Sequence, residues 1–144
     1  MLDLHKQYTS TTKTSYTNTS TTIGTTYYYK VKAVKTVDGT NYTSDLSGAK
    51  SILCKPAAPT VSIYRTNGKP KITWKAVTGA DKYYVYCSTD GKNFSYYDST
   101  TKLSYTNTGA KKNTKYYYKV KAVCASNSNA NSAQSSAVSI KATK

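Results

Sequence analysis

The side chains that could perform chemistry are few and scattered in this sequence. Its only histidine is His5. Six aspartates supply every carboxylate side chain: Asp3, Asp38, Asp45, Asp81, Asp90 and Asp98. Two of them, Asp38 and Asp90, precede a glycine and are typical of tight turns. Because no carboxylate pair, Ser-His-Asp set or glycine-rich phosphate loop is apparent, we expect neither catalytic activity nor a cofactor.

The three cysteines do not form the pattern of a metal site. Cys54, Cys87 and Cys124 are widely separated, and no Cys-x-x-Cys pair occurs. A structural zinc ion needs about four nitrogen or sulfur ligands at suitable spacing, so we expect no metal. The odd number of cysteines also excludes a fully paired disulfide framework within one chain.

Tyrosine and lysine are the side chains that this sequence supplies in quantity. The chain has 16 tyrosines, and 21 basic against 6 acidic residues give a formal net charge of +15. Aromatic rings between basic residues occur in proteins that bind single-stranded nucleic acid. Here every basic residue except Arg65 is lysine, whereas arginine dominates specific phosphate and base recognition. Nucleic acid is therefore not the partner that we expect. The same positive charge would attract acidic polymers of the cell envelope over a long range.

The elements that must position these side chains are expected to be strands. The sequence contains no glutamate, a common helix former, and it is rich in threonine, valine and tyrosine, which suit a pleated sheet. No run of about 18 apolar residues is present, so we expect no membrane insertion. Residues 1–5 lack the apolar stretch of a signal peptide, so an extracellular location would need a signal outside this sequence.

An internal repeat organises the chain. Residues 10–34 and 99–123 are identical at 18 of 25 positions, at an offset of 89 residues. With a gap of one residue, the match continues between residues 44–52 and 132–140. A period of this length exceeds the usual unit of a solenoid, about 20–50 residues, and indicates a small domain that folds by itself.

The repeat predicts one partial and one complete copy. By the offset, Met1 falls opposite Asp90, so the first copy lacks the counterpart of residues 57–89. A short Pro/Ala segment at residues 55–59 separates the copies and is expected to be a semi-rigid linker. We place the N-terminal copy, with its linker, at residues 1–56 and the C-terminal copy at residues 57–144.

The C-terminal copy is expected to form seven short strands separated by turns. Turn signals and alternation place the strands at residues 60–64, 71–75, 82–88, 94–98, 103–108, 114–125 and 137–142. Seven short strands with regular turns and no helical period are typical of an antiparallel β-sandwich. The N-terminal copy would then hold only the fourth to seventh strands.

Alternation along the sixth strand predicts its buried face. Side chains two residues apart share a face of a strand, and burial of unpaired lysine ammonium groups in a core costs free energy. The inward set is expected to be Trp74, Tyr83, Val85, Tyr116, Tyr118, Val120 and Ala122. We interpret these residues as core packing, with the hydroxyl of Tyr116 bonded back to nearby backbone as in a tyrosine corner.

Three motifs of the C-terminal copy resemble the fibronectin type III family. They are Ile72-Thr-Trp74 in the second strand, Tyr83-Tyr-Val85 in the third, and Thr114-Lys-Tyr116-Tyr-Tyr118-Lys-Val120-Lys-Ala122-Val123 in the sixth. The resemblance covers residues 57–144 in full, and residues 1–54 from the fourth strand onward. It implies an all-β, immunoglobulin-like sandwich. The sequence pattern of residues 71–86 is similar to tandem repeats of Gram-positive bacterial surface proteins and secreted enzymes.

The resemblance also implies an outward-facing surface of tyrosines and lysines. In this family the third and sixth strands are neighbours in one sheet, which would gather Tyr84, Tyr86, Tyr117, Lys119 and Lys121 on one exposed face. Such a face could bind acidic cell-wall or other polysaccharide. The alternative is that these cross-strand pairs only stabilise the sheet.

The same strand arrangement gives an expectation for the cysteines. Cys87 and Cys124 would end antiparallel strands at opposite poles, so we expect no bond between them. Cys54 and Cys124 form the only pair worth considering, and otherwise the thiols are free and partly buried.

The functional expectation is a non-catalytic spacer and interaction module of an extracellular or cell-surface protein. Its partners would be neighbouring domains of the same polypeptide. An accessory module for acidic polysaccharide is the alternative. The uncovered core face of the N-terminal copy is expected to result from truncation of a longer array, or else to be completed by another chain.

Overall fold

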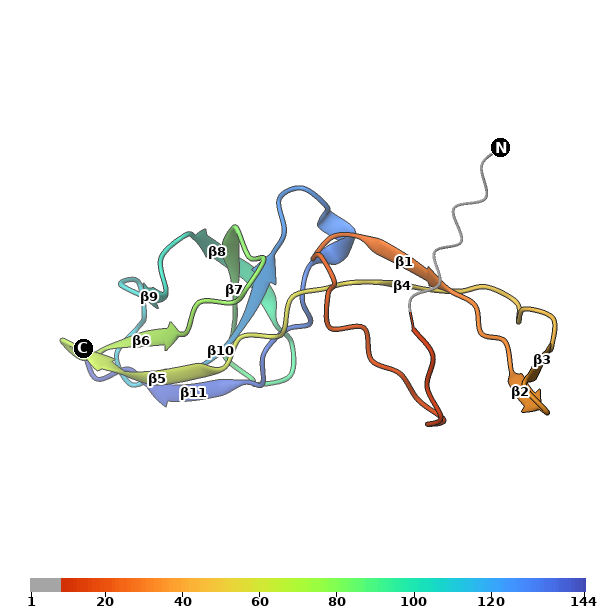
Figure 1. Ribbon diagram of the computed structural model, residues 1–144. Coiled ribbons are helices and arrows are strands. Elements are labelled where there is room, and N and C mark those ends of the chain that lie inside the picture. The colour runs from red at the N-terminus through yellow and green to blue at the C-terminus, as the bar shows by residue number, and fades with distance from the viewer. Residues whose placement is uncertain (1–8) are drawn as a thin grey trace.

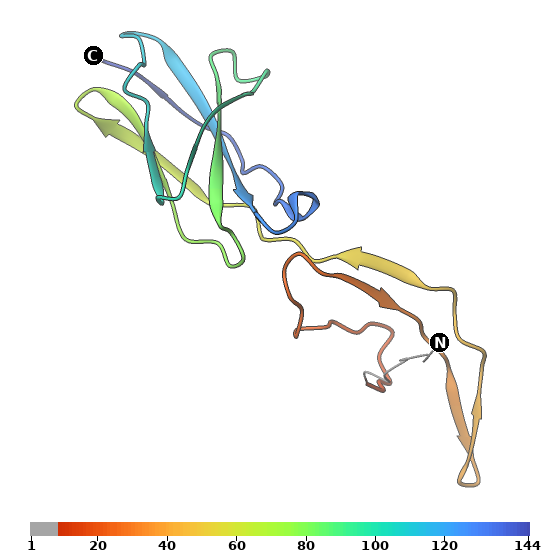
Figure 2. The same ribbon diagram turned by 90° about the horizontal axis from the view of Figure 1, so that it is seen from above.

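The computed structural model describes residues 9–144 and consists of two parts arranged end to end (Figure 1). A β-sandwich contains the C-terminal copy, and a narrow arm of paired strands contains the N-terminal copy. Seen from above, the arm extends away from one end of the sandwich (Figure 2). Within residues 9–144, no helix is long and apolar enough to cross a membrane.

The C-terminal copy forms two antiparallel sheets, with strand orders β11-β10-β7-β8 and β5-β6-β9. The strands are β5 (Val61–Thr66), β6 (Lys69–Trp74), β7 (Lys82–Ser88), β8 (Ser95–Thr100), β9 (Ser104–Thr106), β10 (Lys115–Val123) and β11 (Val138–Lys141). A short 3-10 turn, η1 (Ser128–Ala130), follows β10. The expected seven-stranded sandwich is confirmed, and every strand boundary lies within two residues of its expected position.

Alternating side chains of both sheets build the core. The buried cluster consists of Ile72, Trp74, Tyr83, Val85, Tyr118, Val120 and Ala122. Tyr116 is half-buried and packs against this cluster. Val85 of β7 pairs with Val120 of β10, and both side chains are fully buried. All seven residues expected to face inward therefore lie in or against the core, because the period of two holds along both central strands.

Two tyrosine hydroxyls of β10 anchor the segment that precedes it. The hydroxyl of Tyr116 accepts a hydrogen bond of 2.9 Å from the backbone N–H of Lys111, which is the link expected of a tyrosine corner. The hydroxyl of Tyr118 accepts one of 2.8 Å from the side-chain amide of Asn107. Asn107 is itself buried and accepts from the Tyr97 hydroxyl at 2.9 Å. Burial of Tyr118 raises its pKa above the ordinary tyrosine value.

The arm repeats the last two strands of the sandwich. β1 (Thr26–Tyr29) pairs antiparallel with β4 (Lys50–Leu53), as β10 pairs with β11. Between them, β2 (Val34–Val37) and β3 (Thr40–Thr43) form a hairpin at the far end of the arm (Figure 2). Asp38 and Gly39 make its turn with φ angles of 47° and 78°, the positive values that two-residue hairpin turns require.

The arm lacks one strand that the sequence predicts and contains a hairpin, β2–β3, that the sequence did not predict. Residues 14–19 correspond to the expected fifth strand, within which β9 lies, yet they form no strand. The reason is the partner: β9 pairs with β6, and no counterpart of β6 exists in the described part of the N-terminal copy. Most of the expected fourth strand, together with Asp3 and His5, lies outside the described residues.

Candidate functional site

The outward face of β7 and β10 brings the expected tyrosines and lysines together. Tyr86 pairs with Lys119, and Tyr84 pairs with Lys121. These four side chains alternate with the buried set and are partly exposed. Tyr117 lies near one end of the face, beside the turn after β7: a Cβ atom added at Gly91 would lie 3.0 Å from its ring. We call this surface the Tyr/Lys face.

Two aromatic residues that the sequence did not point to complete the Tyr/Lys face. Tyr96 of β8 is 56% exposed, and its ring meets those of Tyr84 and Tyr86 edge-on at 5.3 and 6.2 Å between centroids. Phe94 contributes a ring beneath the ammonium group of Lys119, with Nζ 4.4 Å from the ring centroid. The rings of Tyr84, Tyr86 and Tyr96 therefore form an aromatic cluster that joins β7 and β8.

A β-bulge explains why Tyr96 was missed. The register between β7 and β8 shifts between Val85 and Tyr86, so that Val85 pairs with Asp98 while Tyr86 pairs with Tyr96. A bulge inserts one residue and re-aims the side chains on either side of it. Simple alternation along residues 94–98 cannot locate that inserted residue. The sequence did indicate that the third and fourth strands would be neighbours, because they follow each other along the chain.

Lysine side chains cover several rings of the Tyr/Lys face. The Nζ atom of Lys82 lies 5.4 Å from the Tyr84 ring centroid, and that of Lys115 lies 5.1 Å from the centroid of Tyr117. These distances are within the range of cation–π attraction. Ring surfaces covered by ammonium groups are less open to stacking sugars, whereas the ammonium groups can attract anions.

A tight acidic turn supports one end of this face. The carboxylate of Asp90 accepts hydrogen bonds from the Ser88 hydroxyl at 2.6 Å and from the backbone N–H groups of Lys92 and Asn93, both at 2.8 Å. These donors, led by the Ser88 hydroxyl, hold the pKa of Asp90 well below its usual range. All partners are local, so the carboxylate organises the turn rather than acting as a catalytic base.

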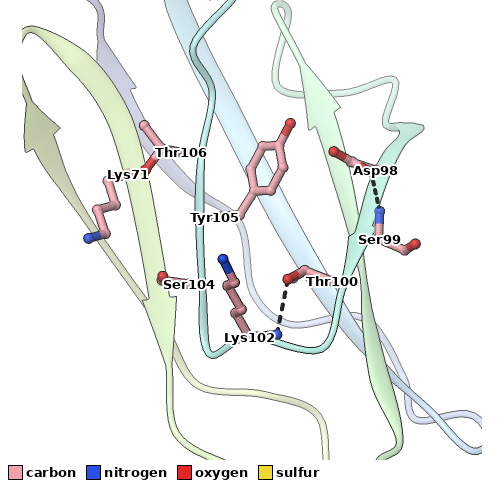
Figure 3. A pocket seen from close by; sticks show the side chains of 8 residues that line it. All are labelled: Lys71, Asp98, Ser99, Thr100, Lys102, Ser104, Tyr105 and Thr106. Carbon is pink, nitrogen blue, oxygen red and sulfur yellow. Dashed lines mark hydrogen bonds between the residues drawn. The ribbon is translucent and has the colours of Figure 1, made fainter.

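A shallow polar cavity of about 360 Å³ opens between β8 and the β6–β9 pair (Figure 3). Its lining residues are Lys71, Asp98, Ser99, Thr100, Lys102, Ser104, Tyr105 and Thr106. Burial raises the pKa of Tyr105, and the Asp98 carboxylate raises it further. A neutral tyrosine, one carboxylate and two lysines do not form a nucleophile–base set.

The cysteines are free thiols and form no metal site. Cys124 is buried, whereas Cys54 and Cys87 are half-buried. Burial raises the pKa of Cys87, which lowers its reactivity. Among residues 9–144, no group of three or more histidine, cysteine, aspartate or glutamate side chains could hold a metal ion.

The two copies meet at a defined junction. The side-chain amide of Asn127, the residue that caps η1, donates a hydrogen bond of 2.9 Å to the backbone carbonyl of Gly24. Ile23 lies against Gly79 so closely that an added Cβ atom there would come within 2.7 Å of it. Pro56 and Pro59 of the connecting segment are buried. Sequence reasoning found the linker but not these contacts, because they join residues far apart in the chain.

The comparisons place the fold among known proteins. Over 90% of its length the chain is similar to 46% of the chicken CNTN1 FN1-FN3 domains, with 18% identity and a TM-score of 0.51. It matches 17% of a beta-1,2-glucanase from Parabacteroides distasonis, with 24% identity and a TM-score of 0.56 over 76% of this chain. An Fn3-like protein from Clostridium thermocellum is 38% identical over 55% of this chain and 88% of its own, with a TM-score of 0.45.

No protein-family model and no curated protein sequence matches the chain. The similarity to the chicken CNTN1 FN1-FN3 domains nevertheless shows the fold, and the motifs of the second, third and sixth strands occupy the positions that the resemblance implied. The chain therefore has the fibronectin type III fold.

Proposed function

We propose that this chain is a non-catalytic spacer in an extracellular or cell-surface multidomain protein, in which it holds neighbouring domains at a fixed distance and angle. The junction between the copies is the observation that carries this proposal. A flexible tether would leave consecutive copies without contact. Here a hydrogen bond from Asn127 and the packing of Ile23 on Gly79 join them directly.

The junction combines contacts of two kinds. The Asn127 amide is partly buried, and its oxygen accepts from the N–H of Asn129, which fixes the direction of the amide nitrogen. Ile23 supplies apolar contact, and the two buried prolines restrict the connecting segment. A hollow of about 370 Å³ remains beside Ile23 and the linker. The orientation of the arm relative to the sandwich therefore depends on few contacts and should change when these contacts are removed.

Residual dipolar couplings of the complete chain test the spacer proposal. We expect amides of β1 and β4 to share one alignment tensor with amides of the sandwich. The double variant Ile23→Ser with Asn127→Ala should reduce the alignment of the arm and leave the sandwich unchanged. Asn129→Ala, an exposed neighbour in η1, is the matched control. Independent alignment of arm and sandwich in the unmodified chain would refute a stiff spacer.

A second function is supported by the Tyr/Lys face. Ammonium groups over aromatic rings, in a chain of net charge +15, favour an anionic polymer, and we propose acidic cell-wall polysaccharide as its ligand. Tyr96, the most exposed ring of the face, is the residue best placed to contact a sugar. Binding should be weak and salt-dependent, because partly exposed charges are screened.

Retention of the chain on purified acidic wall polysaccharide tests this second function at low and moderate salt. Tyr96→Ala and the pair Tyr84→Ala with Tyr117→Ala should each reduce retention. Tyr64→Ala is the matched control, because its ring also lies under a lysine, Lys71, but on the other sheet. Equal loss in all variants, or none, would refute a defined face. Stronger retention on mixed-sequence DNA with a steep salt slope would indicate nucleic acid instead.

A further inference from the structure

The arm exposes a strand edge and an apolar surface that its sister copy keeps covered. β1 pairs with β4 alone, and no described strand lies on its other edge. Beyond the end of β1, Val31 is 72% exposed. An open strand edge with apolar side chains beside it is a template for another strand.

The C-terminal copy shows what covers this surface. Val31 corresponds to Val120 at the repeat offset of 89 residues. Val120 is fully buried because β7 pairs along β10, from Tyr117 to Val123, and places Val85 opposite it. The covering element is thus a strand of the pattern of β7, which is preceded in sequence by a strand bearing Ile72 and Trp74.

The backbone of the arm is already set for such pairing. The N–H groups of Val31 and Ala33 bond to the hydroxyls of Ser47 and Ser44 at 3.0 and 2.9 Å. The equivalent N–H groups of the C-terminal copy bond in the same way to two serine hydroxyls, while the strand's other edge receives β7. Because backbone groups alternate in direction along an extended strand, those of Lys30 and Lys32 point to the open side.

We propose that residues 28–34 are an acceptor site for a polypeptide segment with the sequence pattern of residues 57–89. The donated third strand would run antiparallel to the arm, with its tyrosine and valine equivalents of Tyr83 and Val85 over Ala33 and Val31. Main-chain hydrogen bonds would supply affinity, and the alternating apolar side chains would supply specificity. The donor is not β7 of a second copy of this chain, because β7 is held between β10 and β8.

A titration of the complete, isotope-labelled chain with a synthetic peptide of residues 57–89 tests the site under reducing conditions. We expect saturable binding of one peptide per chain and slowed hydrogen exchange at Lys30 and Lys32. Amide shifts should occur at residues 28–34 and at residues 15–17, where the β6 segment of the peptide would pair as β6 pairs with β9. Absence of binding would overturn the proposal. Shifts confined to β5–β11 would do so as well, because they would mean exchange into the sandwich. Self-association through residues 28–34 without peptide would assign the surface to a second copy instead.

Matched variants identify the surface. Val31→Asp should weaken peptide binding about tenfold or more, since it buries an unpaired charge on binding. Val37→Asp is the control: that valine is also exposed but lies in the distal hairpin. A peptide carrying Val85→Asp should lose affinity to a similar degree. Equal effects of Val31→Asp and Val37→Asp would contradict a site at residues 28–34.

Discussion

The two copies share local bonding and differ in burial. Tyr27 and Tyr29 of the arm stack at 6.4 Å and accept hydrogen bonds from Thr22 and Asn18, just as Tyr116 and Tyr118 stack at 6.3 Å and bond to Lys111 and Asn107. Yet Tyr118 is 1% exposed while Tyr29 is half-exposed. The exposure of the equivalent valines differs more strongly still: Val120 is fully buried and Val31 is 72% exposed. Local sequence thus directs the hydrogen bonds, whereas the core depends on strands supplied from elsewhere.

This contrast separates two sources of stability. A hydrogen bond open to water contributes little, because water offers the same partner. The same bond inside a closed sandwich is costly to break, since the group left behind loses any partner. Equivalent substitutions in the two copies should therefore have unequal effects, and the difference measures the contribution of the covering strands.

The largest expected difference is between Val120→Asp and Val31→Asp. An unpaired charge at the fully buried Val120 should destabilise the sandwich by about 3–5 kcal/mol, most of the stability of a small domain. Val31→Asp should leave the melt unchanged. Urea denaturation followed by the fluorescence of Trp74, the only tryptophan, reports on the sandwich selectively. A similar loss in both variants would mean that the arm is not open at this position.

A smaller difference is expected between Tyr118→Phe and Tyr29→Phe. Removing the Tyr118 hydroxyl leaves the buried Asn107 amide without this partner, at a cost of about 1–3 kcal/mol. Water can replace the hydroxyl at Tyr29, so that variant should match the unmodified chain. The same denaturation experiment measures both. Substitution of Asn107 by alanine together with Tyr118→Phe should cost less than the two single changes added.

Alkaline pH should destabilise the sandwich through the same tyrosine. The pKa of Tyr118 is raised by burial above its ordinary value of 10.0. A group with a raised folded-state pKa contributes stability below its unfolded pKa and loses it as pH rises toward the folded one. We therefore expect the urea midpoint to fall above pH 10, and to fall less in Tyr118→Phe. An equal fall in both proteins would contradict this assignment.

The smallest difference is expected at the tyrosine corner. Tyr116→Phe should cost about 1 kcal/mol through its lost bond to the Lys111 backbone, because Tyr116 is only half-buried. Tyr27→Phe removes the equivalent bond to Thr22 in the arm and should not change the melt of the sandwich. Thermal unfolding followed by the fluorescence of Trp74 measures both variants. A larger loss of stability in Tyr27→Phe than in Tyr116→Phe would contradict the expected difference between the two copies.

Much of the fold could be predicted from the sequence, since alternation and turn residues are local signals. They located the seven strands, the inward set and the backbone link of Tyr116. The bulge beside Tyr86 could not be predicted, because it depends on how two strands adjust to each other. The missing strand at residues 14–19 was also beyond prediction by repeat matching: near-identical sequence forms a strand only where β6 is available to pair with it.

The candidate site was predictable in part for the same reason. Tyr84, Tyr86 and Lys119 follow from strand order and alternation. Tyr96 joins them through the bulge, and the lysines over Tyr84 and Tyr117 depend on side-chain positions that no pattern encodes. The junction contact of Asn127 with Gly24 spans 103 positions of the chain and left no local signal.

Native-state hydrogen exchange of the complete chain tests the central claim most directly. The amides of Val120 and Ala122 bond to serine hydroxyls within the closed sandwich, and those of Val31 and Ala33 make the same bonds in the open arm. We predict that the first pair exchanges only through unfolding of the whole sandwich, whereas the second pair exchanges rapidly. Equal protection of both pairs would contradict the account, because it would show that the arm is as well covered as its sister copy.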